Sequence, residues 1–367
     1  MSQIENFAFF DEGEAKRVFE ELKKYTYGVV KRVERKVKRV YPPPLHSLTS
    51  LQREANKKLG FSAKKTLDVA QMLYETYKVI SYPRTESRYL ATSNRPLVEE
   101  ILKKLGREDL IPRVAEVGRR VFDDTKLTDH HAIIPLDRAK NLPPDGAKLY
   151  DLILKRFLAV FYPPYVYESV LILTEVGNEY LFLTRLRRTL DPGWRVVYGF
   201  KPEGEGEIPP LRVGDKVKKV DQRLEKKKTE PPPRYTEGTL LKEMERLGLG
   251  TPATRAQIIE TLKARKYVTK RGKVLIPTEK GRELIEKLKT SKVASPEMTA
   301  EWEKKLEEIH LKGLGYRGYL QFLEAIKGFT AEEVDRLKET TFEVSKDFKT
   351  SKGRTKRKTY RRGKKSR

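Results

Sequence analysis

The chain has 367 residues, enough for two or three domains, and its 78 lysines and arginines against 52 acidic residues give a formal net charge of +26. It has no cysteine and only four histidines, which excludes disulfides, cysteine nucleophiles and cysteine-based zinc modules and leaves no clear metal site. Because a large positive excess favours a polyanionic partner, nucleic acid is the expected class of ligand.

The first residues predict no targeting segment. The stretch MSQIENFAFFDEGE is acidic and lacks the basic start and long apolar run of a signal peptide. The apolar run from Phe157 to Leu173 is interrupted by Pro163 and Pro164, so it predicts no membrane span. We therefore expect a cytoplasmic protein that does not bind a membrane.

The first predicted elements are a short helix and a basic strand. Residues 14–24 carry apolar side chains on one helical face. The segment Tyr27–Val40 is ambiguous, because its valines recur at helical spacing whereas β-branched residues introduced by Gly28 favour a strand. We interpret it as a strand, which the proline run 42–44 ends.

A mostly helical region follows over residues 45–167. One helix begins near Leu48, and Ser62 can cap a second one. The second helix carries an apolar stripe that we interpret as core packing, made by Leu67, Ala70, Leu73, Tyr74 and Tyr77. Further helices are expected around 96–105 and 147–161.

The helix that Ser62 can cap leads directly to Tyr82. Pro83 fixes its own φ and biases Tyr82 away from the helical region. Side chains two apart on an extended segment share a face, so Tyr82 and Arg84 can point at one phosphate. A phenol with a pKa of about 10 is a poor nucleophile and needs such a cation. Taken alone, however, the tripeptide Tyr82-Pro83-Arg84 is more often an ordinary turn with a surface arginine.

Residues 166–229 predict a set of strands, over 167–176, 180–186 and 216–224. These strands could pair with the strand near the start of the chain. That pairing would make residues 41–165 an insertion within a sheet domain.

After a run of three prolines, a new pattern begins. Thr236 can cap one helix, and Thr251 with Pro252 at the first helical position starts another. Two short strands, 267–269 and 273–276, precede a third helix. This order predicts a winged helix, a fold that binds DNA in many proteins and serves only for packing in others.

The last part of the chain is predicted to be helical and then disordered. Residues 295–340 continue as helix. Beyond about Lys346 we expect a disordered tail, because eleven basic residues and no acidic one lie between Lys349 and Arg367.

Four motifs in this order resemble type IA DNA topoisomerases, and the first of them resembles the topoisomerase III branch most closely. They cover residues 43–56 with 60–63, residues 82–87, residues 129–135, and residues 232–237 with 250–255. The resemblance extends over about residues 1–330. It implies an α+β multidomain fold that forms part of a type IA torus.

The resemblance also implies roles for individual residues. Tyr82 would attack the DNA backbone and form a 5′-phosphotyrosine link, Arg84 would stabilise the scissile phosphate, and His130 would assist electrostatically. The expected DNA contacts are Ser87, Arg88, Thr254, Arg255 and Arg265. For Thr254, in the first turn of a predicted helix, a local capping role is an equally good alternative to phosphate contact.

One part of the family pattern is missing from the sequence. A complete type IA enzyme has a Toprim domain whose D-x-D motif and upstream glutamate hold Mg²⁺, and no D-x-D-x-E occurs here. We therefore expect no metal on this chain and a split enzyme, in which a Toprim-bearing polypeptide supplies Mg²⁺. The implied substrates are single-stranded and negatively supercoiled DNA of the nucleoid.

The sequence thus predicts a β-rich arch over 1–40 and 166–230, with a helical domain carrying Tyr82 inserted over 41–165. A winged-helix domain over 231–330 and a helix end with a basic tail over 331–367 complete the expected architecture. Two alternatives stay open: a non-catalytic winged-helix DNA-binding protein, and a truncated remnant of a topoisomerase.

Overall fold

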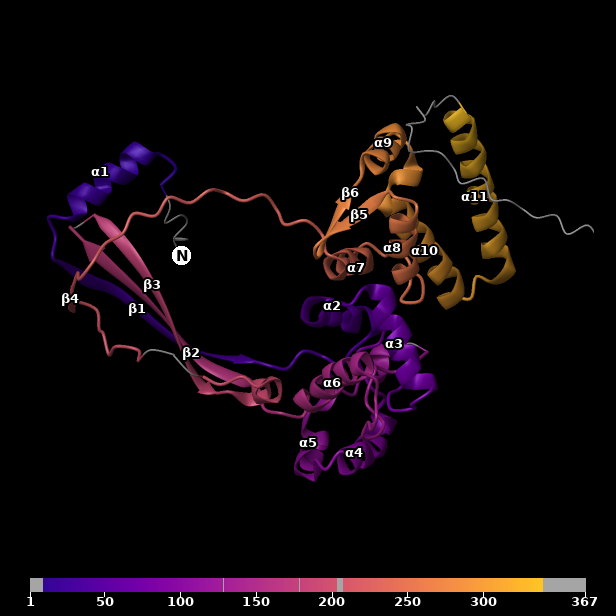
Figure 1. The fold of residues 1–367 in the computed structure, drawn as a ribbon, viewed down its shortest axis with the longest axis horizontal. Helices are drawn as coiled ribbons and strands as arrows, with labels where there is room; N and C mark the ends of the chain where they lie inside the picture. Colours follow the sequence, from indigo (N-terminus) through magenta and orange to yellow (C-terminus); the bar gives the residue numbers. More distant parts are fainter. Residues whose placement is uncertain (1–8, 128, 178, 203–206, 339–367) are drawn as a thin grey trace, which may run out of the picture. The chain divides into compact units, whose positions relative to one another are not determined.

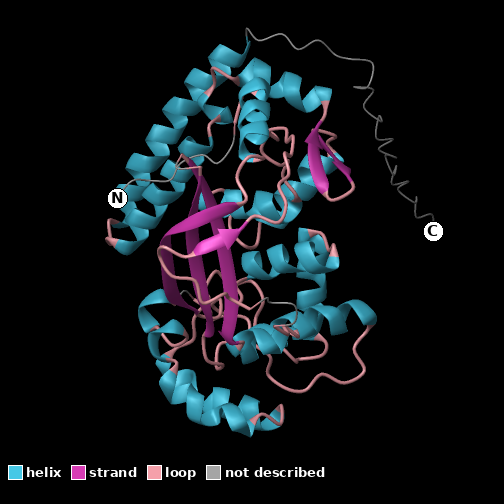
Figure 2. Ribbon diagram, turned by 90° about the vertical axis from the view of Figure 1, so that its left-hand side faces the viewer, coloured by secondary structure: helices cyan, strands magenta, loops and turns pink. Residues whose placement is uncertain are grey.

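The computed structural model describes residues 9–127, 129–177, 179–202 and 207–338, so the expected basic tail lies outside the described residues. The chain divides into two compact units. Unit 1 contains residues 1–246, 250–260 and 272–274, and unit 2 contains residues 247–249, 261–271 and 275–367. The fold mixes helices and sheet (Figures 1 and 2).

Unit 1 contains a four-stranded antiparallel sheet with the strand order β3-β2-β1-β4, drawn in magenta in Figure 2. Its strands are β1 (Tyr27–Val40), β2 (Tyr165–Val176), β3 (Tyr180–Asp191) and β4 (Lys216–Lys218). The strand prediction for 27–40 is confirmed, and its β-branched side chains explain why: Val30 packs with Val170 and Ile172 of β2 in a small apolar cluster.

The long strands β1 and β2 are neighbours in the sheet, although β1 ends at Val40 and β2 begins at Tyr165. The chain between them forms a set of helices (Figure 1). These are α2 (Leu48–Leu59), α3 (Ala63–Glu75), α4 (Arg95–Lys104), α5 (Ile111–Glu116) and α6 (Pro144–Ala159). The predicted cap of α3 is present, since the Ser62 hydroxyl accepts the Lys65 backbone N–H at 3.0 Å.

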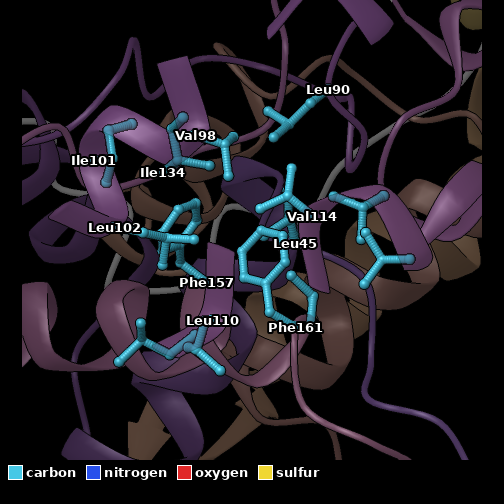
Figure 3. Close-up of a cluster of buried hydrophobic side chains, with 14 of the residues drawn as sticks. Leu45, Leu90, Val98, Ile101, Leu102, Leu110, Val114, Ile134, Phe157 and Phe161 are labelled. Atoms are coloured by element: carbon cyan, nitrogen blue, oxygen red, sulfur yellow. The ribbon is translucent and has the colours of Figure 1, made fainter. Parts of the chain in front are cut away.

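Two apolar clusters hold these helices together, and α6 contributes to both. Phe157 lies in the first cluster with residues of α4 and α5, whereas Ile153 lies in the second with residues of α2 and α3. Figure 3 shows the first cluster, in which the rings of Phe157 and Phe161 meet edge to face with centroids 5.3 Å apart. α6 therefore fixes the two halves of the helical insertion against each other.

Helix α1 (Glu12–Leu22) packs on the sheet, where Val18 and Leu22 meet Val176 of β2. Helix α7 (Glu237–Arg246) is joined to the helical insertion by polar contacts. The Gly238 backbone N–H donates to the Asn56 side chain at 3.1 Å, and the buried Glu237 carboxylate accepts the Ala63 backbone N–H at 2.8 Å. A carboxylate is favourable there because Ala63 begins α3, whose first backbone N–H groups lack helical partners.

The division between the units passes through helix α8 (Arg255–Ala264) and the hairpin of β5 (Val268–Arg271) and β6 (Val274–Pro277). Unit 2 continues with α9 (Glu279–Leu288), α10 (Pro296–Leu311) and α11 (Gly315–Lys338). Trp302 of α10 packs edge to face against Phe322 and Phe329 of α11. Within the described parts of the chain, no helix is both long and apolar enough to span a bilayer.

Three predictions about elements need correction. Helix α8 begins at Arg255 and not at Pro252, because residues 251–254 form a turn in which Thr251 O accepts the N–H groups of Thr254 and Arg255. Strand β4 is limited to Lys216–Lys218, where it pairs with β1. The prediction that Tyr74 packs in the core is also wrong, because its side chain is 37% exposed.

Candidate active site around Tyr82

The backbone that carries Tyr82 is fixed by a second segment of the insertion. The Ser81 backbone N–H donates to Ile134 O at 2.9 Å, and the Leu136 N–H donates to Val79 O at 2.9 Å. The buried Ser81 hydroxyl accepts the Ile134 N–H at 2.9 Å and donates to Ala132 O at 3.1 Å. These bonds hold the segments 81–90 and 129–136 side by side.

Burial alternates along the segment that follows α3. Ser81, Pro83, Thr85 and Ser87 are buried, while the residues between them are half-buried or exposed. Because side chains alternate on an extended backbone, Tyr82 and Arg84 share the outward face, as the sequence predicts from their spacing. The buried hydroxyls anchor the other face.

His130 lies against Tyr82. The ring centroids of the two residues are 4.4 Å apart with the planes inclined at 47°. The Thr85 hydroxyl donates to His130 O at 3.0 Å, which ties the histidine backbone to the same segment. Since His130 is exposed and Tyr82 is half-buried, the pair lies at the surface of unit 1.

Tyr74 is the residue near Tyr82 that sequence reasoning missed. It comes from the last turn of α3, and its ring meets Tyr82 edge-on with centroids 5.5 Å apart and planes at 79°. Its apolar spacing suggested core packing, and only its position at the end of a helix that leads into Tyr82 hinted otherwise. The Tyr82 ring therefore has aromatic neighbours from two different segments.

Arg84 supplies a positive charge beside the tyrosine. Its side chain is half-buried, and no carboxylate among the described residues lies within ion-pairing distance of it. A guanidinium without a carboxylate partner can bind a phosphate through two parallel hydrogen bonds. The outward face of this segment thus combines a phenol, an imidazole nearby and an uncompensated cation.

The other expected DNA contacts occupy different environments. Ser87 is buried and its hydroxyl donates to Tyr89 O and Lys126 O, each at 3.3 Å. Arg88 is half-buried and donates to Leu45 O at 3.3 Å. Ser87 is therefore inaccessible to a DNA strand in this conformation, whereas Arg88 remains on the outward face.

Arg255 is buried as well, with 4% of its surface exposed. Its guanidinium donates to the Thr49 hydroxyl at 3.1 Å and to Gly250 O at 2.8 Å, and it lies 3.5 Å from the Glu86 carboxylate. Arg255 thus links the start of α8 to α2 and to the segment that carries Tyr82, which departs from the expected direct contact with DNA.

Thr254 and Arg265 are both exposed. The Thr254 hydroxyl accepts the Thr251 backbone N–H at 2.8 Å, so the local capping role considered for it is present. Arg265 follows α8 and belongs to unit 2, whereas Tyr82 and Thr254 belong to unit 1.

The described residues do not form a metal site of their own. No group of three or more histidine or acidic side chains in the described ranges is arranged to hold a metal ion. Because Mg²⁺ prefers several oxygen ligands, the surroundings of Tyr82 do not fit it without carboxylates from elsewhere.

The sequence of the chain matches a known protein family. The family profile described as DNA topoisomerase matches residues 1–321, and the chain therefore belongs to the DNA topoisomerase family. Its similarity to DNA topoisomerase 3 proteins places it in the type IA class.

Two curated relatives and one solved structure illustrate the similarity. The chain is 36% identical to DNA topoisomerase 3 of Bacillus licheniformis over 355 residues, covering 87% of this chain and 48% of that protein. It is 38% identical to DNA topoisomerase 3 of Shouchella clausii over 380 residues, covering 93% and 50%. The structure of full-length topoisomerase I from Thermotoga maritima is 31% identical in sequence, with a TM-score of 0.73. The match covers 89% of this chain and 56% of that chain. The chain spans about half the length of these curated relatives.

Proposed function

We propose that this chain is the tyrosine-bearing part of a topoisomerase III-like enzyme that cuts single-stranded DNA of the nucleoid and passes strands through the gap. The observation that carries the proposal is the contact of Tyr82 with His130, with Arg84 on the same outward face. Family membership supports the reaction class. A lone exposed tyrosine would not carry it.

In the proposed reaction the Tyr82 phenol oxygen attacks a backbone phosphorus. A bond forms between that oxygen and phosphorus, the bond to the 3′ oxygen breaks, and the leaving oxygen takes up a proton while the phenol loses one. Arg84 stabilises the negative charge that builds up on the phosphate oxygens, and His130 assists electrostatically. Because the phosphate remains a diester, now linked to Tyr82, the 3′ hydroxyl can attack it and reverse the step after strand passage.

The proposed architecture follows the domains expected from the sequence. The pairing of β1 with β2 around the helices supports a β-rich arch over 1–40 and 166–230 with the tyrosine domain, 41–165, inserted in it. The order α7, α8, β5, β6, α9 supports a winged-helix domain over 231–330. Thr254, Arg265 and Arg88 are the proposed contacts to DNA, and the buried Ser87 and Arg255 are proposed to position the site.

We further propose that the Mg²⁺ comes from a Toprim domain supplied in trans. The sequence contains no D-x-D-x-E motif, and the described surroundings of Tyr82 lack a set of metal ligands. When bound, the metal would supply positive charge at the DNA phosphates. At the same phosphate, Tyr82 would attack the phosphorus. Arg84 would bind the phosphate oxygens, and His130 would assist electrostatically.

Relaxation of supercoiled DNA tests this function. The full chain is mixed with a Toprim-bearing polypeptide, Mg²⁺ and negatively supercoiled plasmid, and the topoisomers are separated on a gel. We expect relaxation that Tyr82→Phe abolishes, whereas Tyr27→Phe, on an exposed strand residue, retains it. Relaxation that survives Tyr82→Phe would contradict the role of Tyr82 as the nucleophile. DNA binding without any relaxation would instead support the non-catalytic DNA-binding alternative.

A further inference from the structure

A basic pocket lies within unit 1, beside the segment that carries Tyr82. It has a volume of about 820 Å³ and is formed by α2, the start of α7, the 3₁₀-helix η5 (Gly193–Tyr198), and side chains from other segments (Figure 1 labels α2 and α7). Its cationic lining residues are Arg53, Lys57, Lys58, Arg88, Arg156 and Lys273. Glu54 is the one acidic residue in the described lining.

Glu54 cannot balance this charge, because its carboxylate already has partners. Lys58 lies 2.7 Å from it, and Arg156 forms a close ion pair with it. Within the described ranges, no carboxylate lies within 4.0 Å of the charged groups of Arg53, Lys57, Arg88 or Lys273. The pocket therefore holds four cations without an ion-pair partner among the described residues, an arrangement that favours the binding of an anion.

Arg88 brings one of these charges partly out of water. Its Nε donates to Leu45 O at 3.3 Å, and Arg88 is one of the residues that line the pocket. Burial, followed by the positive charge of Arg156, lowers the pKa of Arg88 from its usual range. The charge of Glu245 opposes this lowering, although its carboxylate makes no ion pair with Arg88. Because a guanidinium stays protonated in proteins, a half-buried one with no ion-pair partner is stabilised by a bound phosphate.

Two aromatic side chains line the same pocket. The Trp194 indole N–H donates to Val40 O at 2.8 Å, and the Tyr198 hydroxyl accepts from Arg156 Nε at 3.1 Å. The two rings meet edge-on with centroids 5.7 Å apart. Both are half-buried, so their orientation is fixed while part of each ring remains accessible. Fixed aromatic rings beside cations are the usual platform for bases of a single strand.

We propose that this pocket is a second subsite for the single strand that is cut at Tyr82, and the proposal therefore rests on the proposed function. A phosphate binds Arg88, Arg53 and Lys57, and a neighbouring base packs against Trp194. Arg88 and Tyr82 are six residues apart on the outward face of one extended segment, so their Cα atoms are at most roughly 20 Å apart. A strand of a few nucleotides can reach both sites.

Tryptophan fluorescence tests the proposal on the full chain. The chain has two tryptophans, so Trp302→Phe leaves Trp194 as the single reporter. Tyr82→Phe is added to prevent cleavage. We expect an oligothymidylate to quench Trp194 at the concentrations where fluorescence anisotropy of the labelled oligonucleotide reports binding.

Charge reversal supplies the second arm of the test. In the same background, Arg53→Glu with Lys57→Glu abolishes the quench and makes the slope of log K against log salt shallower by roughly 0.7, the value for one phosphate that is no longer neutralised on a single strand. The matched control, Lys103→Glu with Lys148→Glu, makes the same charge change at exposed sites on α4 and α6 and retains the quench.

Three results would overturn the subsite. They are oligonucleotide binding that leaves Trp194 emission unchanged, an unaltered quench in the Arg53 and Lys57 variant, and an equal quench by inorganic phosphate at the same phosphate concentration. The last would define a site for small anions only. Conversely, a chain with Tyr82 intact could show a normal quench but form no covalent DNA adduct in the presence of Mg²⁺ and a Toprim-bearing polypeptide. That result would contradict the proposed cleavage reaction and leave the subsite standing.

Discussion

Tyr82 is flanked by aromatic rings from two segments, and its freedom to move depends on both. His130 lies 4.4 Å from it between centroids, and Tyr74 approaches edge-on at 5.5 Å. A reacting phenol gains rate from being held near the phosphorus, because orientation that is already fixed lowers the entropic cost of reaching the transition state. Tyr74 is thus a candidate positioning residue.

Removing the Tyr74 ring should slow cleavage without preventing it. An aromatic pair contributes about 0.5–1.5 kcal/mol, which corresponds to a roughly 2- to 10-fold lower rate of adduct formation in Tyr74→Ala. Tyr74→Phe keeps the ring and should restore the wild-type rate, measured in single-turnover cleavage of an oligonucleotide. Equal rates for Tyr74→Ala and wild type would show that Tyr74 does not position Tyr82.

His46 should make stability depend on pH. Its side chain is buried, and burial, followed by the charges of Arg156, Arg88 and Lys58, holds its pKa well below the usual value. As the pH falls below about 6.5, the unfolded chain therefore binds a proton that the folded chain does not, and stability is lost at up to about 1.4 kcal/mol per pH unit.

Urea unfolding at pH 7.5, 6.5 and 5.5 measures this loss. His46→Gln should reduce the pH dependence over that range, although it lowers the stability at every pH by removing the contact of Nδ1 with the Ser50 hydroxyl at 3.0 Å. His310→Gln, at an exposed position on α10, should keep the wild-type pH dependence. An unchanged dependence in His46→Gln would show that another group titrates.

Between elements, Arg255 connects the start of α8 to α2 and to the Tyr82 segment. A DNA contact and a structural link make opposite predictions for its removal. Because Arg255→Ala leaves the buried Thr49 hydroxyl without its donor and breaks charged hydrogen bonds, it should lower the free energy of unfolding by roughly 2–3 kcal/mol. The ion pair with Glu86 adds little to this value, because the Glu86 side chain is half-exposed and water screens the interaction.

The measurement is again urea unfolding, with Arg265→Ala as the control. Arg265 is exposed, so its replacement should change the unfolding free energy by less than about 0.5 kcal/mol. If Arg255→Ala were as stable as the wild type and only bound DNA more weakly, the direct contact expected from the sequence would be correct and the structural link would be unimportant.

Patterns of neighbouring residues in the sequence predicted helices and strands better than they predicted which side chains are buried. The cap at Ser62 and the valine-rich strand 27–40 are found as expected, because each depends on neighbouring residues. The alternation around Tyr82 follows from Pro83 and an extended backbone. In contrast, the burial of Arg255 depends on Thr49, 206 residues away in the sequence, and no local pattern contains that information.

For the whole molecule, both charge and family membership support the proposed DNA substrate. The formal net charge is +26, and the match to DNA topoisomerases extends over residues 1–321. The resemblance located Tyr82, Arg84 and His130, and the structure brings Tyr82 and His130 into contact. The basic pocket beside α2 could not be read from the sequence, because its lining comes from segments as distant as Arg53 and Lys273.

Detection of a covalent DNA adduct tests the central claim most directly. The full chain is incubated with single-stranded DNA, Mg²⁺ and a Toprim-bearing polypeptide, denatured, digested and examined by mass spectrometry. We expect a nucleotide on the phenol oxygen of Tyr82, present in Tyr27→Phe and absent in Tyr82→Phe. An adduct on another residue, one that persists in Tyr82→Phe, or none in the wild type would contradict the assignment of Tyr82 as the nucleophile.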